Sequence, residues 1–254
     1  MTMHTHQEQI NNEIYNNLGD RWYRADDDPV ALLRAEARTR NPWIRKTIKE
    51  KLQGTIKPLR VLDMGCGGGF LSNDLAKDGH QVVGVDLSKT SLEIAKAYDT
   101  TQSVNYLLSD VTAVPLPSAS FDVVCAMDLL EHVENPHDVI RETSRLLKPG
   151  GLFFLYTFNR TFISWLFAIK ALEWFVKNTP AHLHVYRMFI KPVELNQMCE
   201  STGLEVSEVH GIKPVILAKP TLELLLTGKV NPNFRFKFTK STQCGYLCYG
   251  TKRL

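Results

Sequence analysis

Residues 61–70, VLDMGCGGGF, decide the fold class, because a short apolar run ends in an acid and four of the six residues after Asp63 are glycine. This pattern is typical of a buried strand that turns tightly into a helix. Glycines such as Gly65 and Gly67 tolerate positive φ and let a ligand lie against the backbone. A dinucleotide fingerprint would need glycine where Phe70 stands, and Asp63 would repel a pyrophosphate. An acid suits an ammonium and a sulfonium, so the loop predicts S-adenosylmethionine rather than NAD.

From residue 59 onward, short apolar runs alternate with segments of helical periodicity. Seven runs are expected to be strands, at about 59–63, 81–86, 104–108, 121–127, 152–158, 204–210 and 243–250. Apolar strands that alternate with helices predict a mostly parallel seven-stranded sheet covered on both faces, the Rossmann-like α/β class. The alternation breaks at about 160–202, which we expect to be a helical insertion after the fifth strand.

Ligands of such sheets bind at the carboxyl ends of the parallel strands, where four candidate residues stand. Asp63 is expected to help hold the cofactor ammonium through the glycine loop. Asp86 follows Gly65 by 21 residues, a spacing at which a carboxylate meets ribose hydroxyls. Asp110 is suited to accept from the adenine amino group, and Met127 to lie against the adenine ring or near the sulfonium. Each acid alone is more often a helix cap or a solvated turn, but the three together with the loop indicate a cofactor site.

Composition excludes several functional classes. The net charge of +3 is too small to indicate a nucleic-acid partner, and the five cysteines show no metal-type spacing. No run approaches the roughly 20 apolar residues of a membrane span. The first nine residues are polar and lack a signal-peptide apolar region. We therefore expect a cytoplasmic protein with reduced thiols.

Residues 61–70, Asp86, Asp110 and the turn at 149–151 (PGG) together resemble class I S-adenosylmethionine-dependent methyltransferases. This resemblance implies an enzyme of the methyltransferase class. It also implies two parts, an N-terminal helical cap at 1–54 and a methyltransferase domain at 55–254 that carries the insertion. An aromatic segment within residues 10–28 either closes over the site or packs on the surface.

Three further stretches are similar to one family, the ubiquinone-biosynthesis O-methyltransferases. They are 127–133 (MDLLEHV), 159–166 (NRTFISWL) and 189–195 (FIKPVEL), with His184 five residues ahead of the last. The resemblance implies O-methylation of a phenolic or catechol polyprenyl quinone precursor.

The same resemblance implies roles for individual residues. Arg40 would match an arginine that binds the cofactor, with Arg38 as a rival. A divalent metal, magnesium or zinc, is implied at Asp128, Glu131 and His132, which lie on one side of a helical turn and would lower a phenol pKa. The alternative is that the Glu131–His132 pair orients cofactor or substrate without metal.

The resemblance also implies a second way to ionise the acceptor, which is a histidine that takes its proton. His184 takes the place of the histidine before the 189–195 motif, and it could accept the phenolic proton because the ordinary histidine pKa is near neutrality. His132 is the second catalytic candidate. The alternative for His184 is a surface loop residue without function.

Residues 162–176 are almost entirely apolar and predict a helix with one narrow polar stripe. Such a helix is more often part of the core. The family resemblance favours peripheral contact with the inner membrane, where a lipophilic phenol would be collected.

Two other functions remain open from the sequence. One is a carbon- or carboxyl-methylating enzyme of another small-molecule or lipid acceptor, which the divergent segment after Gly211 permits. The other is a non-catalytic cofactor-binding subunit of a membrane-associated biosynthetic complex.

Overall fold

The computed structural model describes residues 9–53 and 58–254, and in these ranges it contains one eight-stranded sheet. The strands are β1 (Arg60–Met64), β2 (Gln81–Asp86), β3 (Asn105–Leu108), β4 (Phe121–Met127), β5 (Leu147–Phe158), β6 (Leu204–Pro214), β7 (Phe236–Thr239) and β8 (Gly245–Lys252). Their order is β3-β2-β1-β4-β5-β8-β6-β7. The first five strands are parallel, and β8, β6 and β7 each pair antiparallel. The Rossmann-like α/β class is confirmed.

The expected count of seven strands is wrong by one. The additional strand, β7, lies in an alternating aromatic-basic segment that the sequence alone does not place. It pairs with the end of β6 from Gly211 to Pro214, so it extends the edge of the sheet. Local alternation is compatible with strand, but only pairing with β6 provides its hydrogen bonds.

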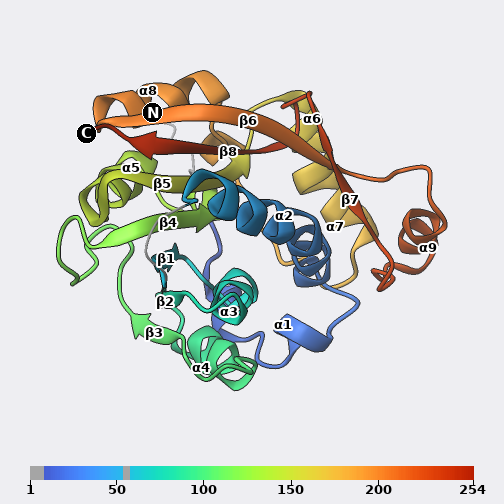
Figure 1. Cartoon of the computed structure of the whole chain (residues 1–254). Helices are drawn as coiled ribbons and strands as arrows, with labels where there is room; N and C mark the ends of the chain where they lie inside the picture. The colour runs from blue at the N-terminus through green and yellow to red at the C-terminus, as the bar shows by residue number, and fades with distance from the viewer. Residues whose placement is uncertain (1–8, 54–57) are drawn as a thin grey trace, which may run out of the picture.

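Helices cover both faces of the sheet, as Figure 1 shows. They are α1 (Arg21–Arg24), α2 (Pro29–Lys51), α3 (Phe70–Lys77), α4 (Lys89–Ala97), α5 (Pro136–Leu146), α6 (Phe162–Ser164), α7 (Ala171–Phe175), α8 (Pro192–Ser201) and α9 (Lys219–Thr227). Short 3-10 turns are η1 (Glu13–Asn16), η2 (Leu130–His132) and η4 (Tyr186–Met188), and η3 (Trp165–Lys170) is a π-helical turn.

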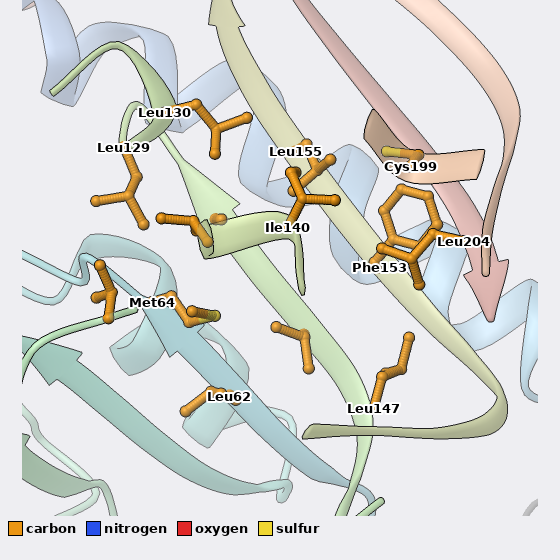
Figure 2. Packing of buried hydrophobic residues seen from close by; sticks show 14 of the residues in the cluster. Leu62, Met64, Leu129, Leu130, Ile140, Leu147, Phe153, Leu155, Cys199 and Leu204 are labelled. Carbon is orange, nitrogen blue, oxygen red and sulfur yellow. The ribbon is translucent and has the colours of Figure 1, made fainter. Parts of the chain in front are cut away.

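Alternation along β1 divides the core into two layers, because successive strand side chains point to opposite faces. Leu62 and Met64 pack with Ile140 of α5 and Cys199 of α8 on one face (Figure 2). Val61 packs on the other face, in a cluster that contains residues of α2 and α3. The carboxyl end of β1 is thereby fixed between two packed layers.

The glycine loop has the backbone that its sequence predicts. Gly65, Gly67 and Gly69 have φ of 68°, 49° and 81°, values that side chains other than glycine rarely adopt. The backbone N–H groups of Gly65 and Cys66 donate to the Val85 carbonyl, so the loop is tied to β2 as well as β1. Helix α3 then begins at Phe70.

Helix α2 runs without interruption through Asn41–Pro42, where the sequence indicated a new helix start. Proline removes one helical hydrogen bond. The helix continues because Ile44 and Ile48 on one face of it are fully buried against the sheet, and packing of an apolar face outweighs local propensity.

Residues after β5 form the expected insertion, in which α6, η3 and α7 follow one another before the chain turns back through η4 to α8. The expected boundary between the cap and the domain, at 54/55, lies outside the described residues. In the two described ranges, no helix combines the length and the apolarity needed to cross a bilayer.

Candidate active site

A cavity of about 310 Å³ lies at the carboxyl ends of β1, β2 and β4, and we call it the glycine-loop cavity. It is lined by six of the predicted cofactor residues, Arg40, Asp63, Gly65, Gly67, Asp86 and Met127. These residues come from α2 and from three strand ends, and the parallel sheet brings them to one edge.

Asp86 and Asp63 are both held in defined orientations. The backbone N–H groups of Gly67 and Ser88 donate to the two oxygens of Asp86, each at 2.8 Å. The Ser72 hydroxyl donates to Asp63 at 2.6 Å. Burial raises the pKa of Asp63 to about 6, although the hydrogen bond from Ser72 and the positive charge of Arg40 oppose the change. Both carboxyls are thus fixed before any ligand arrives.

Asp110 is not among the residues that line this cavity. Its side chain is exposed and one carboxylate oxygen accepts from the backbone N–H and hydroxyl of Thr112, each at 2.8 Å. Its neighbour Val111 lines the cavity instead. The predicted contact of Asp110 with adenine stays a prediction, and the structure gives this carboxylate a local capping role.

Aromatic residues of the N-terminal segment cover the glycine loop. A Cβ atom at Gly67 or Gly68 would lie 2.6 or 2.7 Å from the Trp22 ring, so the indole lies directly on the loop. Its Nε1–H donates to the Ser91 hydroxyl at 3.1 Å, and Tyr23 donates to the Gly68 carbonyl at 2.8 Å. The sequence alone shows this aromatic segment but not whether it covers a site, because no local pattern pairs Trp22 with residues 45 positions away.

A second cavity of about 280 Å³ adjoins the first, and we call it the apolar cavity. Its wall is formed by α2, the end of β5, the insertion, α9 and the segments next to β6 and β7. Its apolar side chains include Leu32, Phe158, Phe167, Leu172, Phe175, Leu183, Ile216, Leu224 and Phe234. Its ionisable residues are Tyr15, Glu36, Asp128, His132, Tyr156, His184 and Cys244. Tyr15, Asp128 and His132 line both cavities, so the two meet at these side chains.

Arg40, which is buried, and Asp128, which is half-buried, form an ion pair at this junction. The Arg40 guanidinium also lies over the Tyr156 ring, 4.9 Å from its centroid. Within the described residues, its Nε and Nη1 atoms have no hydrogen-bond partner. Nε and Nη1 of the buried Arg40 guanidinium therefore remain free to donate to a ligand. Arg38, the alternative candidate, instead donates to the Pro232 carbonyl at 2.9 Å.

The two candidate histidines lie close together, with ring centroids 5.5 Å apart. The Asn12 amide donates to the His132 carbonyl at 2.9 Å, so its oxygen faces His132 Nδ1 at 3.0 Å and that nitrogen carries the proton. The remaining nitrogen, Nε2, lies 3.4 Å from the Tyr15 hydroxyl. His184 Nδ1 donates to the Ala168 carbonyl at 2.8 Å, which leaves Nε2 as the unprotonated nitrogen of the neutral ring.

His132 is buried and His184 is half-buried, and removal from water disfavours the charged form of each ring. Burial lowers the pKa of His132 to about 3, with His184 as a second cause. Burial also lowers the pKa of His184, although its bond to Ala168 opposes the change. Both histidines are therefore neutral at pH 7 and able to accept a proton.

The predicted metal site is not assembled. Among residues 9–53 and 58–254, no group of three His, Cys, Asp or Glu side chains is placed to hold a metal ion. Asp128 is engaged by Arg40, and both Glu131 carboxyl oxygens are buried without a partner in the described residues. Burial and the nearby Asp128 charge raise the pKa of Glu131.

Comparison with protein families supports the enzyme class. A family model described as a methyltransferase domain matches residues 62–155. A ubiquinone biosynthesis O-methyltransferase of Coxiella burnetii is 40% identical over 174 residues, which cover 68% of this chain and 74% of that protein. Another, from Bordetella pertussis, is 37% identical over 212 residues, which cover 81% of this chain and 84% of that protein.

Solved structures share the fold at low sequence identity. A methyltransferase of Thermotoga maritima, described as a possible histamine N-methyltransferase, is 19% identical with a TM-score of 0.61 and covers 95% of this chain and 98% of its own. A magnesium protoporphyrin IX methyltransferase of Synechocystis, solved with bound SAH, is 17% identical with a TM-score of 0.56, covering 84% and 83% of the two chains.

Substitution of Asp86 by Asn should weaken S-adenosylmethionine binding about 10- to 100-fold, because a hydrogen bond to a charged group contributes about 1.5–3 kcal/mol. The matched change Asp110→Asn should alter affinity far less, since that side chain lies off the cavity lining. Isothermal titration calorimetry of both variants measures the difference. An equal loss of affinity in both variants would contradict the placement of Asp86 in the cavity and of Asp110 outside its lining.

Proposed function

The chain belongs to the family of ubiquinone biosynthesis O-methyltransferases, and from this membership we propose that it methylates a phenolic oxygen of a polyprenyl quinone precursor. It is an S-adenosylmethionine-dependent methyltransferase. The observation that carries the substrate proposal is the apolar cavity, whose polar end meets the glycine-loop cavity at Asp128 and His132. An aromatic acceptor bound there would present its hydroxyl beside the cofactor.

Bound S-adenosylmethionine supplies an electrophilic methyl group, and the residues of this chain must align it with the acceptor and exclude water. Asp86 and Asp63 are positioned for the ribose and the ammonium, and the free donors of Arg40 suit the cofactor carboxylate. Trp22 covers the glycine loop and Tyr15 lines the junction, which supports a dry site for the displacement. Closure of this kind places two reactants in line and removes competing water.

We assign proton acceptance to His184. Its Nε2 atom is unprotonated and forms no hydrogen bond with the described residues, whereas Nε2 of His132 lies beside the Tyr15 hydroxyl. Burial raises the pKa of Tyr15 far above its ordinary value, so that hydroxyl stays a donor. His132 is then a positioning residue that fixes Tyr15 and the N-terminal segment over the junction.

Peripheral membrane contact is a further part of the proposal. Exposed apolar side chains gather on the insertion and on residues 216–226, with Phe162, Trp174, Ile216, Leu217, Leu222, Leu225 and Leu226 the main ones. Helices α7 and α9, which carry several of them, pack against each other at the edge that holds β7 (Figure 1). Ile216 and Leu225 also line the apolar cavity, so a bilayer on this surface would lie beside its wall.

Methyl transfer to a short-tailed catechol tests the proposal directly. We expect a methyl ether to form, and at equal rates with added magnesium, with zinc or with chelator, because Asp128 is held by Arg40 and Glu131 is buried. Loss of activity with chelator would instead support a metal site at Asp128, Glu131 and His132. Binding of S-adenosylmethionine without transfer to any phenol would overturn the acceptor assignment.

The His184→Gln variant should lose about 10²–10⁴-fold in kcat, the usual contribution of a general base. Below its pKa the ring is protonated and cannot accept a proton. Because burial lowers that pKa below the ordinary 6.5, wild-type activity should be level above pH 6.5 and fall only at lower pH. His137→Gln, on α5 away from both cavities, is the control. If the activity of His184→Gln still fell at low pH as that of the wild type does, His184 would not be the base.

Sedimentation with vesicles of phosphatidylglycerol and phosphatidylcholine tests the membrane surface. The double variant Trp174→Glu/Leu226→Glu should lose most of its vesicle binding, because each change places a charge at the proposed interface. Val193→Glu, at an equally exposed apolar residue of α8, should bind as the wild type does. Equal behaviour of the two variants would contradict the proposed surface.

A further inference from the structure

The Tyr15 hydroxyl lies where the transferred methyl group must cross from the cofactor to the acceptor. The side chains that line both cavities are Tyr15, Leu33, Asp128 and His132. Leu33 offers no polar atom, and the Asp128 carboxylate is engaged by Arg40. The Tyr15 hydroxyl is therefore a polar group at this crossing that has no chemical role in the function derived so far.

The hydrogen bonds around this hydroxyl turn its proton away from the crossing. His132 Nδ1 donates to the Asn12 amide oxygen at 3.0 Å, so His132 Nε2 is the acceptor of the Tyr15 hydroxyl, 3.4 Å away. Within residues 9–53 and 58–254 the hydroxyl forms no other hydrogen bond. A phenolic oxygen that donates in this way keeps its acceptor capacity. A weak donor on a ligand at the junction would therefore meet an oxygen that is free to accept.

Tyr15 is also fixed relative to the cofactor residues. The Ser88 backbone N–H donates to Asp86 at 2.8 Å, and the Ser88 hydroxyl donates to the Tyr15 carbonyl at 3.2 Å. The Ser91 hydroxyl donates to the same carbonyl at 2.9 Å, and the Tyr15 ring stacks on Trp22 with centroids 5.9 Å apart. One serine thus joins the carboxylate positioned for the ribose to the backbone of Tyr15, so the hydroxyl has a defined place beside the bound cofactor.

The chemistry of a sulfonium ion indicates what this oxygen would contact. A positively charged sulfur withdraws electron density from its methyl group, so the methyl C–H bonds become weak hydrogen-bond donors. A neutral hydroxyl oxygen can accept from them without competing for the methyl group, because it is a poor nucleophile. Contacts that strengthen as the methyl group leaves the sulfur stabilise the transition state more than the ground state, and such contacts raise kcat.

We propose that the Tyr15 hydroxyl oxygen is a catalytic contact that accepts C–H hydrogen bonds from the sulfonium methyl group and aims it at the acceptor. His132, oriented by Asn12, accepts the hydroxyl hydrogen bond and so leaves the oxygen lone pairs to the methyl group. This inference goes beyond the proposed function, because it depends on S-adenosylmethionine as the methyl donor and not on the class of acceptor.

Isothermal titration calorimetry with two cofactor analogues tests the contact without any acceptor. S-adenosylhomocysteine lacks the methyl group, whereas sinefungin carries an ammonium-bearing carbon where the sulfonium and its methyl group would be. Tyr15→Phe keeps the ring but removes the oxygen, so it should lower the affinity ratio of sinefungin to S-adenosylhomocysteine about 10-fold or more. The affinity for S-adenosylhomocysteine itself should stay at the wild-type value.

A kinetic measurement adds a second readout. With the short-tailed catechol, Tyr15→Phe should lower kcat about 3- to 10-fold at an unchanged KM for that acceptor. Tyr186→Phe is the matched control, because this tyrosine is exposed on η4 and lines neither cavity. It should leave both the affinity ratio and kcat as in the wild type.

Three results would overturn the contact. An unchanged affinity ratio in Tyr15→Phe would exclude it. An equal loss of affinity for both analogues would mean that the hydroxyl supports only the fold of the N-terminal segment. A raised acceptor KM with an unchanged ratio would assign the hydroxyl to the acceptor instead. Failure of the wild type to methylate any phenol would count against the proposed function, and the comparison of the two analogues would still decide the role of Tyr15.

Discussion

The ion pair between the buried Arg40 and the half-buried Asp128 is the contact on which the two-cavity arrangement depends. It joins the middle of α2 to the residue that follows β4, and Asp128 adopts a left-handed backbone there, with φ of 53°. Loss of Asp128 would leave the buried Arg40 charge without its partner, which destabilises a fold. The pair therefore fixes α2 as the wall that faces both cavities. It also takes up the carboxylate that a metal ion would need.

The arrangement around this pair divides the work of a methyltransferase between two kinds of surface. Strand ends and the glycine loop present fixed polar groups to the cofactor, because the parallel sheet places its carboxyl ends at one edge. The insertion, α9 and β7 supply apolar side chains that are not part of the parallel sheet. The N-terminal segment lies across the boundary, with Tyr15 lining both cavities and stacked against Trp22. Chemistry is thus confined to the small region where polar and apolar walls meet.

Much of the fold and of the cofactor site could be predicted from the sequence, because both depend on local signals. The run 61–70 contains a strand, a turn that requires glycine, and a helix start, and Asp63 and Asp86 follow from strand ends. Asp110 shows the limit of this reasoning. A strand end predicts the location of the backbone, but a neighbouring Thr112 decided where the side chain hydrogen-bonds. Strand β7 is a second case, since its pairing partner lies more than 20 residues away.

The sequence by itself determined the class of fold, the glycine loop and the family, because each depends on contiguous residues or on a regular spacing of residue types. Only the tertiary structure decided which distant side chains share a site. Trp22 covers Gly67, Arg40 pairs with Asp128 rather than leaving it for a metal, and Glu36 faces the apolar cavity. Each of these contacts is made across tens of residues by packing of α2 and the N-terminal segment on the sheet. No local pattern encodes them, since burial and electrostatic pairing are properties of the folded chain.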